Sequence, residues 1–299
     1  MGRRSTGTGR RRGAAAWRWL ALVALLIGVA FPAVLPAAAK GKGDHCKVTP
    51  QIVRGHKVPD GQNLFMAALL RYDPSATEQK SPYQRQFCGG SVIGPRAILT
   101  AAHCLYGNDA AKVQVLVGRN NLDGTGGVII DALALHVNPS YNPRQTANDA
   151  AVVVLASAIP AEYYHPIALV GSGDTQYEAA GDAVTVSGWG SLHQKGDYPK
   201  DLYEVGVRVY ADSVCAAQKS YGRSYLSASM LCAGAKNPTR DSCFGDSGGP
   251  LFADTPNGPV EVGIVSWGHG CAQKKYPGVY TRLSNAEIND FVRAASVWQ

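Results

Sequence analysis

Three short segments of the chain contain the residue types that acyl-transfer enzymes use. Residues 100–104 hold His103, residues 148–153 hold Asp149 ahead of an apolar run, and residues 241–250 hold Ser247 in a glycine-rich run. A serine hydroxyl is a weak nucleophile until a neighbouring base removes its proton, and a histidine suits that role because its pKa lies near neutrality. A buried carboxylate fixes the tautomer of the imidazole and stabilises its cation. The set predicts a nucleophilic serine with His103 as its base and Asp149 as the orienting group.

The glycines beside Ser247 predict the position of the oxyanion donors. Backbone N–H groups reach a tetrahedral oxyanion only where side chains are absent. Gly245 lies two residues before Ser247, so the N–H groups of these two residues are the expected pair. Each motif alone is compatible with a surface histidine, a turn or a cap. The order His, Asp, Ser in one chain is far more specific.

Short strands separated by turn residues must position these groups. Only residues 285–297 have helical periodicity, with Ile288, Phe291, Val292 and Ala295 on one face. This pattern indicates an all-β barrel or sandwich with a C-terminal helix, in one domain over residues 52–299. Strands are expected at residues 91–93, 97–99, 113–117, 128–137, 150–155, 183–187, 202–209 and 260–267.

The N-terminal residues have the features of a secretion signal. Residues 1–18 are strongly basic, residues 19–34 are apolar, and a small-residue stretch ends at Ala39. We therefore expect a signal peptide over residues 1–39, with cleavage after Ala39. The alternative is a retained membrane anchor, but the apolar run contains Pro32 and falls short of the ~20 residues that a spanning helix needs. The prediction is a secreted, extracellular protein without a stable membrane anchor. The sequence does not select one export route.

The distribution of charge argues against nucleic-acid binding. The formal net charge is +7, but residues 1–51 hold nine basic residues and one acidic residue. The remaining residues hold 20 basic and 21 acidic ones, whereas a nucleic-acid-binding domain keeps its basic patch in the folded part. We expect no nucleic acid among the partners.

The seven cysteines fit an oxidising destination. Their number is odd, so one lacks a partner within the chain, and spacing alone assigns no pairs. They are too dispersed for an ordinary zinc site, and neither a metal nor another cofactor is expected.

The three motifs, in this order, resemble those of the trypsin–chymotrypsin family of serine proteases. Residues 88–90 (Cys-Gly-Gly), 187–190 (Ser-Gly-Trp-Gly) and 266–268 (Ser-Trp-Gly) match as well, and the resemblance covers essentially all of residues 52–299. It implies two six-stranded antiparallel β-barrels (chymotrypsin-like) with the site between them. His103 and Asp149 would come from the first barrel and Ser247 from the second, with Ser266 hydrogen-bonded to Asp149.

The resemblance also implies a specificity for cleavage after Arg or Lys. Asp241 lies six residues before Ser247, where trypsin-like members have a carboxylate at the base of the primary pocket. A buried carboxylate without a partner is costly, and a substrate cation removes that cost. The substrate-binding residues implied in addition are Ser266, Trp267, Gly268 and Gly278, with the two glycines leaving the pocket walls open. The alternative is that Asp241 pairs with Arg240 and the pocket is closed.

Ile52 begins a stretch, Ile-Val-Arg-Gly, that resembles the new N-terminus of activated family members. Residues 40–51 are therefore expected to be a pro-segment, and cleavage after Gln51 would free an ammonium group to pair with Asp246. Because Gln51 is not a trypsin-type cleavage residue, another protease is needed for activation. The alternative is that Ile52 simply belongs to the first strand.

The resemblance also implies three disulfides: Cys88 with Cys104, Cys215 with Cys232, and Cys243 with Cys271. Cys46 is left over and is free, links two chains or leaves with the pro-segment. Calcium-binding members of the family have an acid pair in the loop that here begins with Arg119 and lacks that pair, so no calcium site is expected.

The main rival interpretation is a catalytically silent relative that only binds. Such proteins usually lose a residue of the catalytic set, and this chain keeps all of them. We expect a monomeric endopeptidase whose partners are Arg- or Lys-containing proteins and peptides, together with possible protein protease inhibitors. The segment from Tyr72 to Gln86 is expected beside the cleft, either restricting access or serving as a loop without a role.

Overall fold

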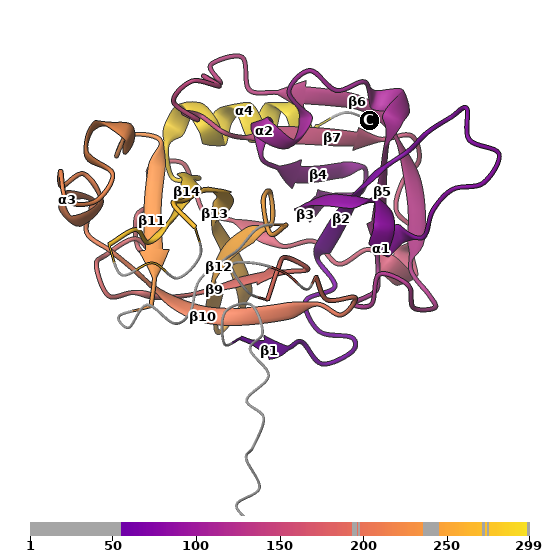
Figure 1. Ribbon diagram of the computed structural model, residues 1–299, viewed down its shortest axis with the longest axis horizontal. Coiled ribbons are helices and arrows are strands. Elements are labelled where there is room, and N and C mark those ends of the chain that lie inside the picture. Colours follow the sequence, from indigo (N-terminus) through magenta and orange to yellow (C-terminus); the bar gives the residue numbers. More distant parts are fainter. Residues whose placement is uncertain are drawn as a thin grey trace, which may run out of the picture. The chain divides into compact units, whose positions relative to one another are not determined.

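The computed structural model describes residues 55–192, 196, 198–235, 245–270, 273 and 275–297 (Figure 1). The leader, the Gln51–Ile52 bond, Asp241, Cys243 and Cys271 lie outside these ranges. Nothing in the structure therefore bears on the expected signal peptide, pro-segment, third disulfide or pocket base.

The first barrel closes from six antiparallel strands. In the order of pairing they are β2 (Met66–Arg71), β3 (Gln86–Gly94), β4 (Ala97–Thr100), β7 (Ala151–Leu155), β6 (Val128–Val137) and β5 (Val113–Val117). The ring closes where β5 pairs back with β2, Leu69 lying opposite Val115. All five residues of β7 are buried, as a continuous apolar run predicts for a strand covered on both faces.

The second barrel closes from six further strands, also paired antiparallel. These are β9 (Ala183–Gly188), β10 (Tyr203–Val209), β11 (Met230–Gly234), β14 (Gly278–Arg282), β13 (Gly258–Trp267) and β12 (Pro250–Thr255), and β12 returns to β9. Two short strands lie outside this ring: β1 (His56–Lys57) pairs with β10, and β8 (Ala168–Leu169) runs parallel to β13. The predicted pair of six-stranded antiparallel barrels is thus confirmed.

The predicted C-terminal helix is also confirmed, as α4 (Ala286–Ser296). Its N-cap is Asn285, whose side chain accepts a hydrogen bond from the N–H of Ile288 at 3.0 Å. The predicted apolar face is buried at Ile288, Val292 and Ala295, and Phe291 is partly buried beside them.

The other helical elements are single turns. They are α1 (Pro82–Arg85), α2 (Ala102–Leu105), α3 (Asp212–Cys215), η1 (Ala110–Lys112), η2 (Ala161–Tyr163) and η3 (Gly222–Ser224). Within the described ranges, no helix is both long enough and apolar enough to cross a bilayer.

The two barrels, purple and orange-yellow in Figure 1, meet through an apolar cluster. Met66 and Leu70 of β2 pack in this cluster with Trp189 and with Phe252 of β12. The rings of Phe65 and Phe252 meet edge to face with their centroids 5.3 Å apart. Burying large apolar and aromatic side chains across this contact holds the barrels together, and the candidate site lies along the same contact.

Candidate active site

His103 and Asp149 form a direct hydrogen-bonded pair. His103 lies in α2, three residues beyond the end of β4 in the first barrel, and Asp149 lies two residues before β7. The imidazole Nδ1 is 2.7 Å from Asp149 Oδ2, and the backbone N–H of His103 donates to Oδ1 at 2.8 Å. The Asp149 side chain is 1% exposed, whereas that of His103 is 28% exposed. When the carboxylate accepts a hydrogen bond from Nδ1–H, Nε2 is the ring nitrogen that is free to accept a proton.

The second barrel supplies the remaining partners of Asp149. Ser266 Oγ of β13 donates to Asp149 Oδ2 at 2.5 Å, and Thr281 Oγ1 of β14 donates to the Asp149 carbonyl at 2.7 Å. These bonds offset the desolvation of a buried carboxylate. The position of the Asp149 carboxylate is therefore fixed jointly by both barrels.

The chain reaches Asp149 through a tight turn with unusual backbone angles. Thr146 and Asn148 have φ values of 52° and 54°, in the left-handed region that β-branched residues in particular avoid. The Asn148 side chain donates to the Ser140 carbonyl at 3.0 Å. Strain of this kind persists only where its surroundings enforce it, and such positions cluster at functional sites.

Ser247 lies in a loop of the second barrel that packs against the backbone of the first. The Ser247 carbonyl accepts a hydrogen bond from the Gly89 N–H of β3 at 2.8 Å. Gly248, with φ at 82°, has no room for a side chain: an added Cβ would lie 2.2 Å from Thr100 Oγ1 and 2.6 Å from the Gly89 carbonyl oxygen. The loop carrying Ser247 is thus placed by backbone contacts with the barrel that carries His103.

Gly245 has a φ of 97°, and an added Cβ would lie 3.0 Å from both Gly190 Cα and Tyr198 Cε1. Only glycine satisfies both the angle and the space. The sequence-predicted oxyanion donors, Gly245 and Ser247, are therefore held at the two ends of a single constrained turn.

Asp246, between these two residues, is fully buried, and its Oδ1 accepts the Gly190 N–H at 2.8 Å. The Ser-Gly-Trp-Gly motif makes room for it, because a Cβ on Gly188 would lie 2.1 Å from Asp246 Oδ1. The predicted partner of Asp246, Ile52, lies outside the described residues.

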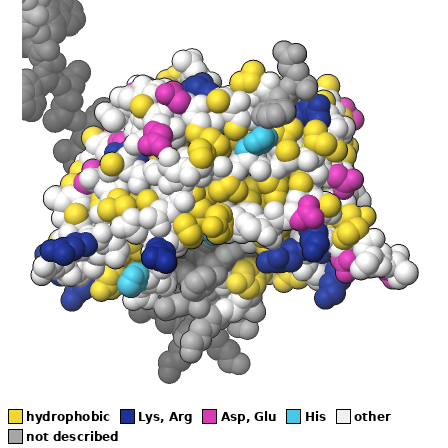
Figure 2. Space-filling view, turned by 90° about the horizontal axis from the view of Figure 1, so that it is seen from above, with side chains coloured by type: hydrophobic (Ala, Val, Ile, Leu, Met, Phe, Trp, Pro, Cys, Tyr) yellow, Lys and Arg dark blue, Asp and Glu magenta, His cyan; other side chains and the backbone are white. Residues whose placement is uncertain are grey.

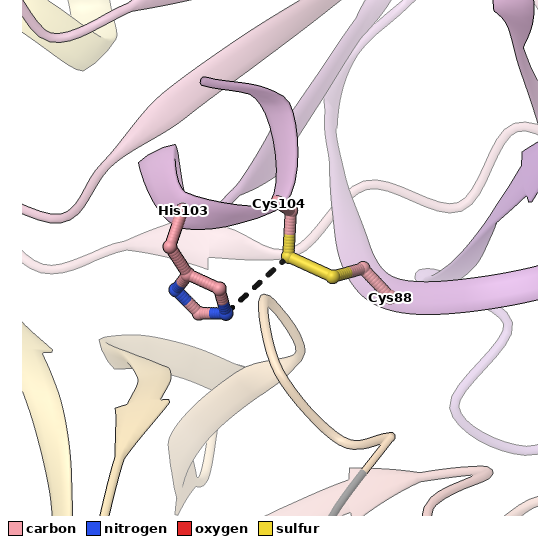
Figure 3. A group of neighbouring side chains, drawn as sticks. All are labelled: Cys88, His103 and Cys104. Carbon is pink, nitrogen blue, oxygen red and sulfur yellow. Dashed lines mark hydrogen bonds between the residues drawn. A yellow bond between two sulfur atoms is a disulfide. The ribbon is translucent and has the colours of Figure 1, made fainter. Parts of the chain in front are cut away.

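A disulfide joins Cys88 of β3 to Cys104 of α2, with its Cα atoms 6.3 Å apart. It lies beside the imidazole, with Cys104 Sγ 3.7 Å from His103 Nε2 (Figure 3). These three residues are close enough together to suggest a metal site. Because the two sulfurs are bonded to each other, the group offers only one nitrogen as a ligand. A second disulfide joins Cys215 to Cys232. Both disulfides among the described residues are therefore pairs that the resemblance implied.

The expected walls of the specificity pocket lie next to each other. A Cβ on Gly268 would lie 4.0 Å from Gly278 Cα, so the two glycines face one another. Trp267 is partly buried and packs edge to face against Tyr221 with centroids 4.8 Å apart. Asp241, expected at the base of this pocket, is outside the described part of the chain.

The Asp149 charge also acts on Tyr141. Burial, and to a lesser extent the negative charge of Asp149, raises the pKa of Tyr141 to about 12. The ring of Tyr141 packs edge to face with that of Tyr106, which is 59% exposed. On the face shown in Figure 2, hydrophobic side chains gather in the middle and charges of both signs are scattered around them.

Three contacts of the site had no counterpart in the sequence-based prediction. Thr281 bonds the Asp149 carbonyl, Thr100 Oγ1 donates to the Gly89 carbonyl at 2.8 Å, and Gln86 Nε2 donates to the Gly245 carbonyl at 3.1 Å. The first and third join residues 132 and 159 positions apart. No local pattern in a single sequence signals a contact over such separations.

Comparison with known proteins agrees with this geometry. The family model described as Trypsin matches residues 52–292. The chain is 40% identical over 238 residues to trypsin alpha-4 of Lucilia cuprina, covering 77% of this chain and 89% of that protein. It is 35% identical over 221 residues to trypsin-1 of Astacus astacus (71% and 90%) and 34% identical over 216 residues to a trypsin of Saccharopolyspora erythraea (72% and 90%). This chain therefore belongs to the trypsin family of serine proteases.

Proposed function

We propose that the chain is a secreted serine endopeptidase, made as a zymogen, that hydrolyses peptide bonds after Arg or Lys. One observation carries the proposal. The His103–Asp149 pair, Ser266 and the loop that carries Ser247 all meet where the two barrels contact each other. Membership of the trypsin family supports the reaction class.

In the proposed mechanism, Ser247 Oγ attacks the carbonyl carbon of the scissile bond while His103 Nε2 takes the hydroxyl proton. The oxyanion accepts hydrogen bonds from the N–H groups of Gly245 and Ser247. His103 then gives its proton to the departing amine, which leaves an acyl-enzyme on Ser247. Water, deprotonated by the same imidazole, releases the acid and restores the serine. Asp149 keeps the imidazole oriented throughout.

The proposed specificity rests on Asp241 together with the facing glycines, Gly268 and Gly278. The two glycines keep the walls free of side chains along a path that a long substrate side chain needs. A carboxylate at the end of that path would pair with a guanidinium or ammonium group, and such charge-assisted bonds are the strong ones.

The proposed activation starts with removal of residues 1–39 as a signal peptide and then of residues 40–51 as a pro-segment. The freed ammonium group of Ile52 would pair with Asp246, which lies between the oxyanion residues and is fully buried. The disulfides Cys88–Cys104 and Cys215–Cys232 support an oxidising, extracellular destination.

The test compares protein made to begin at Ile52 with the full-length chain on chromogenic peptides ending in Arg, Lys, Phe or Ala. We expect fast cleavage after Arg and Lys by the Ile52 form and slow cleavage by the full-length chain. Cleavage of the Phe or Ala peptides at equal rates contradicts the pocket, and equal activity of both forms contradicts the zymogen. A folded Ile52 form that cleaves no peptide supports the alternative, a catalytically silent binding protein.

A further inference from the structure

The segment between β2 and β3 contacts the loop that carries Ser247. It leaves the first barrel after Arg71 and returns through α1 to Gln86, the first residue of β3. Gln86 Nε2 donates to the Gly245 carbonyl at 3.1 Å. The end of the segment therefore lies directly beside the proposed oxyanion residues.

A cavity of about 510 Å³ lies at this contact and is lined by Arg71, Tyr83, Gln86, Phe87, Tyr198 and Gly245, among others. The Tyr83 hydroxyl donates to the Tyr198 carbonyl at 3.0 Å, so the β2–β3 segment is tied to the second barrel across it. Because Gly245 forms part of its lining, the cavity opens directly beside the proposed oxyanion residues.

Among the described residues that line this cavity, Arg71 is the one that carries a charge. Its guanidinium lies over the Phe87 ring, 4.8 Å from the centroid, which restricts its orientation by a cation–π contact. Among the residues that the structure describes, no carboxylate forms an ion pair with it. A planar guanidinium binds carboxylates in preference to other side chains.

The position of the cavity indicates which side of the scissile bond it serves. Trp267, Gly268 and Gly278, the proposed walls for the residue before the bond, do not line it. It lies instead between Gly245 and the residues that precede Cys88. We therefore assign the cavity to the chain after the scissile bond, the leaving-group side.

We propose that Arg71 gives this protease a preference for Asp or Glu among the first residues after the scissile bond. The proposal rests on the proposed function and names a further feature of the substrate. Because Arg71 is exposed, the preference is expected to be modest, about fivefold in kcat/KM, and to weaken as salt is added.

A neighbouring cavity of about 590 Å³ provides the matched control. It shares Arg71 and Phe87 but is also lined by Asp73, Glu78 and Lys112. Its charges are of both signs, and Gly245 is not part of its lining. A change at Lys112 therefore removes a nearby positive charge without altering the cavity beside Gly245.

The experiment uses the full chain carrying a specific endopeptidase site just before Ile52, so that it is activated after purification. The substrates are internally quenched peptides with a single Arg, in which each of the three following positions holds Glu, Gln or Lys. At one of these positions, we expect kcat/KM for the peptide with Glu to be about fivefold higher than for the peptide with Gln. Arg71→Gln should equalise the two, Arg71→Glu should favour the Lys peptide, and Lys112→Ala should keep the preference for Glu.

Equal cleavage of the Glu and Gln peptides at all three positions overturns the proposal, as does a preference for Glu that persists in Arg71→Gln. Cleavage after Arg that shows no preference leaves the proposed function standing. Failure of the activated wild-type chain to cleave any of the peptides overturns the proposed function, and this proposal with it.

Discussion

Ser91 Oγ donates a hydrogen bond to Glu261 Oε2 at 2.5 Å and so joins β3 of the first barrel to β13 of the second. Glu261 is 0% exposed, and none of the residues that the structure describes forms a hydrogen bond with its Oε1. Burial raises the pKa of Glu261 to about 8 and outweighs the opposite effect of the Ser91 hydrogen bond. The barrels are therefore joined through a carboxyl group that is neutral around pH 7 and below.

This contact predicts that stability falls as the pH rises. The folded-state pKa of Glu261 lies above its ordinary value of 4.5, so the folded chain holds this proton more tightly than the unfolded chain. The contribution of Glu261 to the free energy of unfolding is fully present below about pH 4.5 and is lost as the pH rises towards about 8. Glu261→Gln keeps an acceptor for Ser91 and cannot ionise, so its free energy of unfolding should depend less on pH.

The measurement is denaturant unfolding at about pH 5, 6, 7 and 8, in a Ser247→Ala background that prevents self-digestion. Asp290→Asn, an exposed change on α4, is the control and should keep the wild-type pH dependence. Parallel pH profiles for Glu261→Gln and the wild type would show that Glu261 is ionised throughout.

The hydrogen bonds of Arg119 predict that the loop over residues 119–126 needs no bound metal ion. Its guanidinium donates to the carbonyls of Leu122, Gly124 and Gly126 at 2.5, 2.6 and 3.0 Å. A side-chain cation thus binds the carbonyl groups of this loop. We expect Arg119→Met to lower the free energy of unfolding by about 1 kcal/mol, since it removes hydrogen bonds to partly buried carbonyls, and we expect EDTA to leave the wild-type Tm unchanged. Thermal unfolding checks both, with the exposed Arg223→Met as control. A Tm lowered by EDTA would point to a bound metal ion instead.

Ser247→Ala should abolish turnover while the fold stays intact, because no other hydroxyl replaces the proposed nucleophile. A fall of about 10⁶-fold in kcat is the magnitude expected for loss of a catalytic serine. Activity on an Arg peptide and the far-UV circular dichroism spectrum should be measured together. Ser224→Ala, on the exposed η3 turn, should behave as the wild type. Amidase activity retained in Ser247→Ala would contradict the assignment of the nucleophile.

Asp241→Ser should lower kcat/KM for Arg and Lys peptides by about 10³-fold or more, because the substrate cation loses its buried partner. Peptides with Phe or Ala at that position should lose much less. The ratio of kcat/KM values for Arg and Phe peptides is the quantity to measure, with Asp290→Ser as a control on the surface. An unchanged ratio would mean that Asp241 is not at the base of the pocket.

Some strands were predictable from the sequence because their own residues favour that state. Residues 113–117 and 128–137 were predicted with the bounds of β5 and β6, since runs rich in β-branched residues fit a pleated, half-buried surface. Strands β11 and β14 were not predicted. They are short, glycine ends β11 and begins β14, and they are stabilised by pairing Cys232 with Val279 across a long stretch of chain. The pattern of short strands with one C-terminal helix narrowed the fold to a barrel or a sandwich, and the resemblance supplied the two barrels.

The residues of the site likewise differ in how far the sequence could predict them. Motifs pointed to His103, Asp149 and Ser247 as the proposed catalytic residues, because acyl transfer requires those residue types. The alternation of residues in the strand of residues 260–267 places Glu261 where a polar residue normally faces water. In the folded chain that position faces the first barrel, so the carboxyl group is buried. Burial of this kind depends on how two barrels meet, which the pattern within one strand does not contain.

Beside Ser247, the first and second barrels contact each other through main chain. A Cβ on Gly89 would lie 3.3 Å from Gly249 Cα, and one on Gly248 would collide with Thr100 and with the Gly89 carbonyl. At these positions two backbones in direct contact place the loop that carries Ser247, in addition to the Ser266 and Thr281 hydrogen bonds that hold Asp149 across the same contact. A new substrate preference in this chain therefore has to arise at the rims of the cleft, while the placement of the reacting groups stays the same for every substrate.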